Sequence, residues 1–221
     1  MITGRRVLIV RNSETAPEGA FGRWLAEQGA AITVVSGADL PEREAEAQAA
    51  DLTMFLGSPH GVYDTHIPWI AAQRGIVRRL ADAGRPILGI CFGAQMLAAA
   101  TGVDAKPIGE GRAFLGVFGN EDASADLWRG PFVRWHGDHL SPPPGAIVMA
   151  RDGGTVQAFR QDNRLGVQFH PEATPEIVRS WVARFADRVD GPAVLAAAEA
   201  IPTPVALYAE MVRQVLNPGI A

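Results

Sequence analysis

The chain has 221 residues, of which 48% are apolar and 20% are charged, and its formal net charge is −4. This composition is typical of a soluble globular protein with one large α/β domain, and the acidic balance argues against a nucleic-acid partner. No apolar stretch approaches the roughly 20 residues that span a bilayer, and the opening MITGRRVLIVRN lacks the pattern of a secretory signal. The single cysteine excludes an internal disulfide and favours a reducing, cytoplasmic location.

Short β-branched runs alternate with longer amphipathic segments in the first half of the chain. This alternation predicts a mostly parallel sheet covered by helices. The expected strands are 6–10, 31–35, 52–57 and 86–90, and the expected helices are 19–28, a short one opened by Pro41, 67–83 and 94–102.

After residue 103 the pattern changes to shorter strands separated by Pro- and Gly-rich turns, which is typical of an antiparallel or mixed flank beside a parallel core. A final amphipathic helix is expected from Pro175 to about 189. We therefore predict one domain over 1–190 and a helical extension over 191–221 that packs on it, with a contact to a second copy or another partner as the alternative. The expected strands are 113–118, 131–135, 146–150, 155–160 and 164–169, and the stripe expected to pack is Val205, Tyr208, Met211, Val212 and Val215.

The only cysteine lies in GICFGAQ (89–95), between an expected buried strand and a helix. Gly89-Ile90-Cys91-Phe92-Gly93 has the Gly-x-nucleophile-x-Gly form of a sharp strand-to-helix turn, which needs small neighbours and lifts the central side chain clear of the sheet. The positive end of the helix dipole favours a thiolate at this position. The alternative is a small buried side chain without chemistry, because free cysteine is among the most buried residue types.

GVQFHPE (166–172) supplies a candidate base. Because side chains alternate along an extended chain, Gln168 and His170 share one face. Glu172 follows on the same side, where it can accept a hydrogen bond from the imidazole and orient it. A strand-end histidine beside an unrelated glutamate is the alternative. The combination with the elbow favours Cys91, His170 and Glu172 as nucleophile, base and orienting residue.

Acyl transfer also needs donors for a developing oxyanion. The N–H of Phe92, directly after the cysteine, is the expected first donor. The turn in LGSPHGVYD (56–64) follows the third expected strand, and the amides of Gly57 and Ser58 are the expected further donors. An ordinary β-turn with Ser and Pro in favoured places is the alternative.

Together these motifs resemble those of the class I, triad-type glutamine amidotransferases, over about residues 5–185. The resemblance extends to the amidotransferase part of GMP synthetase, and it implies a three-layer, flavodoxin-like α/β fold with a mostly parallel central sheet and an antiparallel flank. The family pattern G-x-C-x-G-x-Q is met by Gly89, Cys91, Gly93 and Gln95, and the pattern H-P-E is met by His170, Pro171 and Glu172. The pattern G-G-P corresponds to Gly57-Ser58-Pro59, and the pattern S-H-G-D corresponds to Trp135-His136-Gly137-Asp138.

The resemblance also implies a reaction. Cys91 attacks the side-chain amide of glutamine, ammonia leaves, and water hydrolyses the γ-glutamyl thioester. By the same resemblance, Gln95 and the segment Trp135, His136, Gly137 and Asp138 hold the amino-acid end of the substrate. Gln95 lies one helical turn beyond Cys91, so that both can line one pocket, although a solvent-facing helix position is the commoner fate of glutamine.

Two positions depart from the family pattern. Ser58 replaces the second glycine of the oxyanion turn; if the backbone needs a positive φ there, Ser carries strain and the hole forms only when a ligand or partner binds. Trp135 stands where relatives often carry Ser or Asn, which predicts a changed pocket wall. Trp-His-Gly-Asp is similar to stand-alone members of the family, some of which are γ-glutamyl peptidases.

Three functions fit these residues. The first is a stand-alone amidotransferase or glutaminase subunit that releases ammonia or passes it to a separate synthase, since no Walker-type nucleotide loop is present. The second is a γ-glutamyl peptidase or hydrolase with the same triad, and the third is a catalytically silent binding or regulatory homologue. Elbow-cysteine proteins of the deglycase-like superfamily match less well, because they lack His-Pro-Glu. No cofactor is expected, and no metal either, because the spacing of His60, His66, His136 and His139 fits no common site.

Overall fold

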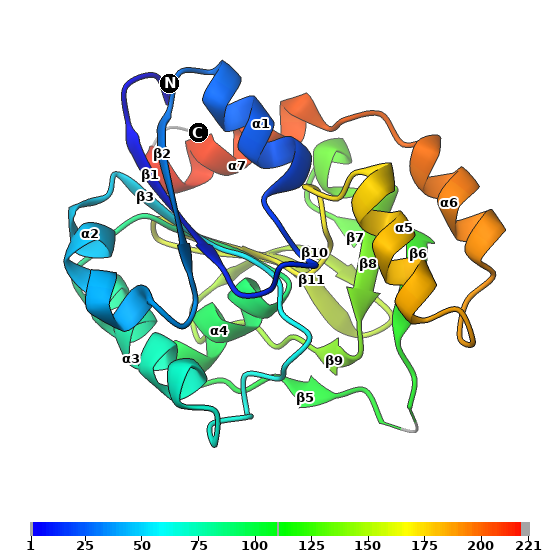
Figure 1. The fold of residues 1–221 in the computed structure, drawn as a ribbon, viewed down its shortest axis with the longest axis horizontal. Coiled ribbons are helices and arrows are strands. Elements are labelled where there is room, and N and C mark those ends of the chain that lie inside the picture. The colour runs from blue at the N-terminus through cyan, green and yellow to red at the C-terminus, as the bar shows by residue number, and fades with distance from the viewer. Residues whose placement is uncertain (1, 110, 218–221) are drawn as a thin grey trace.

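The centre of the protein is a sheet in which parallel strands continue into antiparallel ones (Figure 1). The computed structural model describes residues 2–109 and 111–217, and over these residues the main sheet has eight strands in the order β2-β1-β3-β4-β12-β11-β10-β7. The mostly parallel sheet with an antiparallel flank that the sequence predicts is confirmed. The parallel strands are β1 (Arg6–Arg11), β2 (Ala31–Ser36), β3 (Leu52–Phe55), β4 (Ile87–Ile90) and β12 (Arg164–Val167). The antiparallel strands are β11 (Thr155–Gln161), β10 (Ile147–Asp152) and β7 (Asp122–Ala123).

Helices cover both faces of this sheet, and each face has its own apolar core (Figure 1). On one face lie α1 (Gly19–Glu27) and α7 (Val205–Leu216), where the rings of Phe21 and Tyr208 stack with centroids 4.4 Å apart. On the other face lie η1 (Leu40–Arg43), α2 (Glu44–Ala49), α3 (Pro68–Asp82) and α4 (Phe92–Ala100). Burial of apolar side chains on both faces explains why the central strands read as continuous apolar runs.

A smaller unit adjoins the antiparallel end of the sheet. It consists of α5 (Pro175–Arg184) and α6 (Gly191–Glu199), which pack with the two-stranded ribbon of β6 (Phe114–Phe118) and β8 (Phe132–His136). The short strands β5 (Lys106–Pro107) and β9 (Asp138–His139) form a second ribbon, and η2 (Asp126–Trp128) precedes β8.

The elements expected from the sequence are present, with shifted boundaries. The helix expected over 94–102 begins at Phe92, directly after the cysteine, and the helix expected to reach about 189 ends at Arg184. The strands β5, β7 and β9 were not predicted, because two-residue strands carry no periodicity. The expected extension over 191–221 contains α6 and α7, and its last residues, 218–221, lie outside the described part. Four residues of the predicted stripe are buried, whereas Val205 is exposed.

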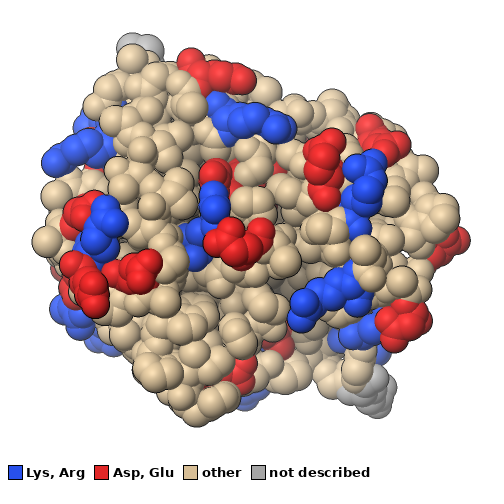
Figure 2. Space-filling view, viewed as in Figure 1, with Lys and Arg blue, Asp and Glu red and all other residues tan. Residues whose placement is uncertain are grey.

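The outer surface carries acidic and basic side chains interspersed over the face shown in Figure 2. No helix in the described ranges combines the length and the apolar character that crossing a bilayer requires.

Strand pairing determines where the chemistry gathers. Since β1, β3, β4 and β12 are parallel, their carboxyl ends meet at one edge of the sheet, which is the usual ligand-binding edge of such sheets. In the register of β4 and β12, Ile90 lies opposite Val167, and the N–H of Cys91 donates to the carbonyl of Val167 at 2.8 Å. Residues 91 and 168–170, which are far apart in sequence, are thereby neighbours.

Candidate active site

Cys91 occupies a strained turn between β4 and α4. Its backbone has φ 52° and ψ −109°, a conformation that non-glycine residues rarely adopt and that is typical of a nucleophile elbow. The flanking glycines are required by close contacts. A Cβ at Gly89 would lie 2.4 Å from the carbonyl oxygen of Gly93, and a Cβ at Gly93 would lie 2.0 Å from that of Phe55. After Phe92 and Gly93, α4 consists of good helix formers, Ala, Gln, Met and Leu, and the helix begins directly after Cys91.

His170 and Glu172 form a buried pair beside this turn. Nδ1 of His170 lies 2.7 Å from Oε1 of Glu172, and the two residues are only 4% and 1% exposed. The carboxylate has no proton to donate, so Nδ1–H donates to it and Nε2 is left to exchange a proton with Cys91 or a substrate.

The charges around His170 determine its protonation. Burial alone lowers the pKa of the imidazole, but the charges of Glu172 and Cys91 outweigh burial and raise that pKa from 6.5 to about 10. His170 is therefore an imidazolium at neutral pH whenever Cys91 carries its negative charge. The geometry thus supports a thiolate–imidazolium pair oriented by Glu172.

The turn after β3 lies close to both side chains. A Cβ at Gly57 would lie 3.3 Å from Cε1 of His170 and 4.0 Å from Cβ of Cys91. Asn12 fixes the start of the turn by donating to the carbonyl of Leu56 at 3.0 Å. Gly57 and Ser58 line the same cavity as Cys91, and Phe92 follows the cysteine at the start of α4, so their role as an oxyanion hole stays a prediction.

Ser58 does not carry the strain that a positive φ would impose. Apart from glycines, the described residues with positive φ are Cys91 and Asp162. The hydroxyl of Ser58 instead accepts a hydrogen bond from the N–H of His60 at 3.2 Å, which stabilises the turn. The condition under which Ser58 would carry backbone strain is therefore not met in this structure.

The end of β8 forms another wall of the site. Arg134 anchors this strand through a buried ion pair with Asp152 and a 2.7 Å hydrogen bond to the carbonyl of Gly119. Trp135 packs against Trp181 and Phe185 of the α5 region, with centroids 5.6 and 5.8 Å apart. An aromatic wall therefore lines the pocket at Trp135.

His136 and Asp138 follow on the same wall. Nδ1 of His136 lies 3.0 Å from the backbone carbonyl of Asp138, so Nδ1 carries the proton. Burial lowers the pKa of His136 to about 3, which keeps the ring neutral. Burial also raises the pKa of the Asp138 carboxyl, which accepts a 3.2 Å hydrogen bond from the hydroxyl of Tyr63. Tyr63, from the turn after β3, thereby lines the same cavity as Asp138, a contact that the sequence did not predict.

Gln95 lines the same pocket and lies one turn along α4 from Cys91. It is buried rather than solvent-facing, and its Nε2 donates to Oε1 of Gln168 at 3.1 Å. Nε2 of Gln168 in turn lies 3.5 Å from Sγ of Cys91. The sequence placed Gln168 on the face of His170 but assigned it no role.

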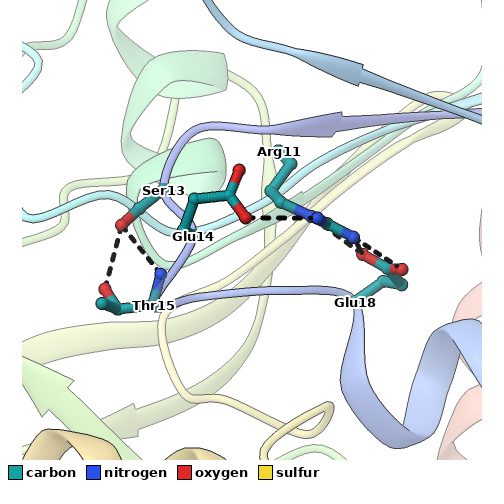
Figure 3. A network of polar contacts seen from close by, with 5 residues as sticks. All are labelled: Arg11, Ser13, Glu14, Thr15 and Glu18. Atoms are coloured by element: carbon teal, nitrogen blue, oxygen red, sulfur yellow. Dashed lines mark hydrogen bonds and ion pairs between the residues drawn. The ribbon is translucent and has the colours of Figure 1, made fainter.

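These residues line a single cavity of about 400 Å³. Further parts of its wall are the segment that includes Pro107, Arg112 and Leu115 and the loop between β1 and α1, which includes Thr15 and Ala16. Figure 3 shows how this loop is held: Arg11 pairs with Glu18 at 2.8 Å and with Glu14 at 3.5 Å, and the hydroxyl of Ser13 contacts that of Thr15 at 2.9 Å. The cavity brings together all the predicted substrate-binding positions, Gln95, Trp135, His136, Gly137 and Asp138, with Gly57, Ser58, Cys91 and His170.

The site shows acid–base and nucleophilic groups rather than a metal-binding arrangement. Among residues 2–109 and 111–217, no three His, Cys, Asp or Glu side chains are grouped as ligands of one ion.

A family model described as "Glutamine amidotransferase class-I" matches residues 19–186, which include every residue of the site from Gly57 to Glu172. The chain belongs to this family. Its glutamine-hydrolysing GMP synthase relatives include that of Pyrobaculum aerophilum, 30% identical over 163 residues, and that of Brucella melitensis biotype 1, 35% identical over 136 residues. The matches cover 70% and 56% of this chain but 31% and 26% of the relatives, so the amidotransferase chain corresponds to less than a third of either synthase.

The fold of this chain is similar to those of solved glutamine amidotransferase structures. A glutamine amidotransferase from Thermotoga maritima superposes with a TM-score of 0.81 at 21% identity, covering 96% of this chain and 98% of that one. A glutamine amidotransferase from Methylobacillus flagellatus superposes with a TM-score of 0.78 at 23% identity, covering 99% and 96%. Both matches extend over nearly the whole chain, including the region of α6 and α7.

Proposed function

We propose that this protein is a glutamine amidotransferase that hydrolyses the γ-amide of glutamine through a Cys91 γ-glutamyl thioester. The observation that carries the proposal is the elbow cysteine with positive φ beside the buried His170–Glu172 pair. Membership of the class I family supports the substrate, because the GMP synthases among its relatives are named as glutamine-hydrolysing.

The proposed reaction has two steps. In the first, the Cys91 thiolate attacks the γ-carbonyl carbon, and the oxyanion is stabilised by amides of Gly57, Ser58 and Phe92. The imidazolium of His170 then gives its proton to the departing nitrogen, which leaves as ammonia, and the thioester remains. In the second, His170 takes a proton from water, the resulting hydroxide attacks the thioester, and collapse releases glutamate and the thiolate.

In this proposal Gln95, Trp135, His136, Gly137 and Asp138 hold the amino-acid end of glutamine. The ammonia is released or passed to a separate synthase, as in a two-chain version of the GMP synthase relatives, of which this chain spans only a part.

A γ-glutamyl peptidase or hydrolase is the second candidate. A cavity of about 400 Å³ with the aromatic wall of Trp135, Trp181 and Phe185 has room for a ligand larger than glutamine. Both candidates use the same acyl-enzyme, so the choice depends on the leaving group.

The test is a substrate panel of L-glutamine and γ-glutamyl dipeptides, with wild-type protein and Cys91→Ala. We expect glutamate and ammonia from glutamine with wild-type protein, and no product from Cys91→Ala. Faster turnover of dipeptides than of glutamine would favour the second candidate. Absence of product and of any trapped thioester from the entire panel, also after addition of a synthase domain, would overturn both.

A further inference from the structure

A row of buried amides runs from the cavity to the nucleophile. Nε2 of Gln168 lies 3.5 Å from Sγ of Cys91, and Nε2 of Gln95 lies 3.1 Å from Oε1 of Gln168. Gln168 is completely buried and Gln95 is 3% exposed, so neither amide can exchange these contacts for water. Gln168 plays no part in the mechanism proposed above.

The direction of this row follows from the sulfur. A thiolate has no proton and can only accept, so the NH₂ group of Gln168 must face Sγ. Its carbonyl oxygen then faces Gln95 and needs a donor, which the NH₂ group of Gln95 supplies. The arrangement leaves Oε1 of Gln95, at the cavity end of the row, as an acceptor.

A second contact of the sulfur favours the opposite protonation state. The carbonyl oxygen of Trp135 lies 4.0 Å from Sγ of Cys91 and can accept only from the S–H form. Cys91 is 5% exposed, and a buried anion is costly unless donors face it, so a hydrogen-bond donor in addition to His170 favours the thiolate.

We propose that Gln168 is a positioning residue that donates a hydrogen bond to the Cys91 thiolate and holds the sulfur toward the cavity, and that Gln95 fixes the orientation of the Gln168 amide. This inference deepens the proposed function and rests on it for the role of Cys91 as nucleophile. It concerns the state of the sulfur before any substrate binds.

Other ionisable groups act on the same sulfur and must stay unchanged in a test. His170 and Glu172 lie beyond β12, His136 lies on β8 and Asp138 on β9. Further charged or ionisable residues line the rest of the cavity: His60, Tyr63, Arg112, Arg184 and Arg188. Substitution of a neutral amide leaves all these groups in place.

The experiment measures the rate of Cys91 alkylation by iodoacetamide as a function of pH. Gln168→Met keeps the unbranched shape and removes the donor. Gln157→Met is the matched control, because Gln157 lies opposite Gln168 between β11 and β12, is equally buried, and its side-chain amide makes no hydrogen bond to any described residue. Since Cys91 is the only cysteine, every modification reports on this site.

We expect the midpoint of the pH–rate profile to move upward by about one unit in Gln168→Met, which is a tenfold smaller thiolate fraction or about 1.4 kcal/mol. In Gln157→Met the midpoint should stay within about 0.3 unit, since a neutral amide that does not contact the sulfur contributes little to its charge. If Gln168→Met does not fold, as judged by circular dichroism and thermal unfolding, Gln168→Glu replaces it. This variant preserves shape, adds a carboxylate beside the sulfur and should raise the midpoint further.

The proposal is overturned if the midpoint of Gln168→Met equals that of wild type, or if Gln157→Met moves the midpoint by the same amount as Gln168→Met. Where Gln168→Glu replaces Gln168→Met, a midpoint equal to that of wild type overturns the proposal. The readout needs no substrate. Failure of every γ-glutamyl compound to react would therefore overturn the proposed function while leaving the alkylation result to stand, and an unshifted profile in an active enzyme would overturn only the role of Gln168.

Discussion

Replacing Glu172 with glutamine removes the charge that holds His170 as an imidazolium while keeping the shape of the side chain. The pKa of His170 lies at about 10, compared with the ordinary 6.5, although burial acts to lower it, and Glu172 makes the larger of the two charge contributions that raise it. Without this carboxylate only the interaction with Cys91 opposes burial, and we expect the pKa of His170 to fall toward its ordinary 6.5. At pH 7.5 the imidazolium fraction would then fall by about tenfold, and by a further factor of ten for each additional unit.

Loss of the oriented tautomer adds to this effect, so we expect kcat/KM for glutamine to fall by about 100-fold or more in Glu172→Gln. The alkaline limb of the pH–rate profile reports loss of the imidazolium, and it should move from near pH 10 in wild type to several units lower in the variant. The assay is coupled detection of glutamate between pH 5 and pH 10.5. Glu176→Gln is the control, since this carboxylate lies exposed at the start of α5, and it should behave as wild type.

Stability gives an independent check of the same ion pair. Because folding raises the pKa of His170, the stabilisation is fully present below pH 6.5 and is lost as the pH rises through about 10. The difference in unfolding free energy between wild type and Glu172→Gln should therefore shrink over that interval in urea titrations. Activity within threefold of wild type together with an unmoved alkaline limb would refute the assignment of Glu172 as the orienting charge.

Two further predictions concern the frame of the site. Gly93→Ala places a Cβ 2.0 Å from the Phe55 carbonyl oxygen and should lower the unfolding free energy by about 3 kcal/mol in urea titrations. Gly75→Ala is the control, because the nearest atom to its added Cβ is the flexible end of Arg79 at 3.3 Å. The unfolding free energy of Gly75→Ala should match that of wild type or exceed it by up to about 1 kcal/mol. Equal stabilities of the two variants would contradict the close contact. Burial lowers the pKa of His136 to about 3, so the neutral buried ring destabilises the fold as the pH falls from 6.5 toward 3. Between pH 7 and 4.5, the unfolding free energy of wild type should fall by about 2 to 3 kcal/mol more than that of His136→Asn. Equal decreases in the two proteins would show that His136 is solvated.

The strands and the elbow could be predicted because their signals are local. Apolar runs that alternate with amphipathic segments fix a parallel sheet, and two glycines around Cys91 fix a tight turn whatever the rest of the chain does. The pairing of β4 with β12 is different. The chain between these two strands folds into most of the antiparallel flank and the two ribbons before it returns to the sheet as β12. No local pattern in the sequence predicts that return. The joint occurrence of the elbow and His-Pro-Glu predicted that His170 serves Cys91, but only the paired strands show how the two side chains come together.

Walls of the cavity were harder to predict than its reactive groups. Tyr63 reaches Asp138 across 75 positions in sequence, and Trp181 donates from its indole to the carbonyl of Thr15 at 2.6 Å across 166. Neither residue has a neighbour in sequence that indicates a pocket, and each reads as an ordinary loop or helix aromatic. Contacts of this kind arise from the packing of α5 and of the turn after β3 against the sheet edge, so only the assembled fold reveals them.

Gln168 shows where the limit of prediction lies. Alternation along the strand places Gln168 and His170 on one face, and the structure agrees, since Phe169 between them lies in the core. The face alone does not say which of the two side chains meets the sulfur, because that depends on the register of β4 and β12. Paired residues of these strands, such as Gly89 with Gly166 and Ile90 with Val167, are 77 positions apart in sequence. A shift of one residue would turn both side chains into the core and bring Phe169 to the sulfur. The glycine at 166, whose Cβ would lie 2.4 Å from the ring of Phe159, opposes such a shift. The same local packing that fixes the register therefore determines the donor to Cys91.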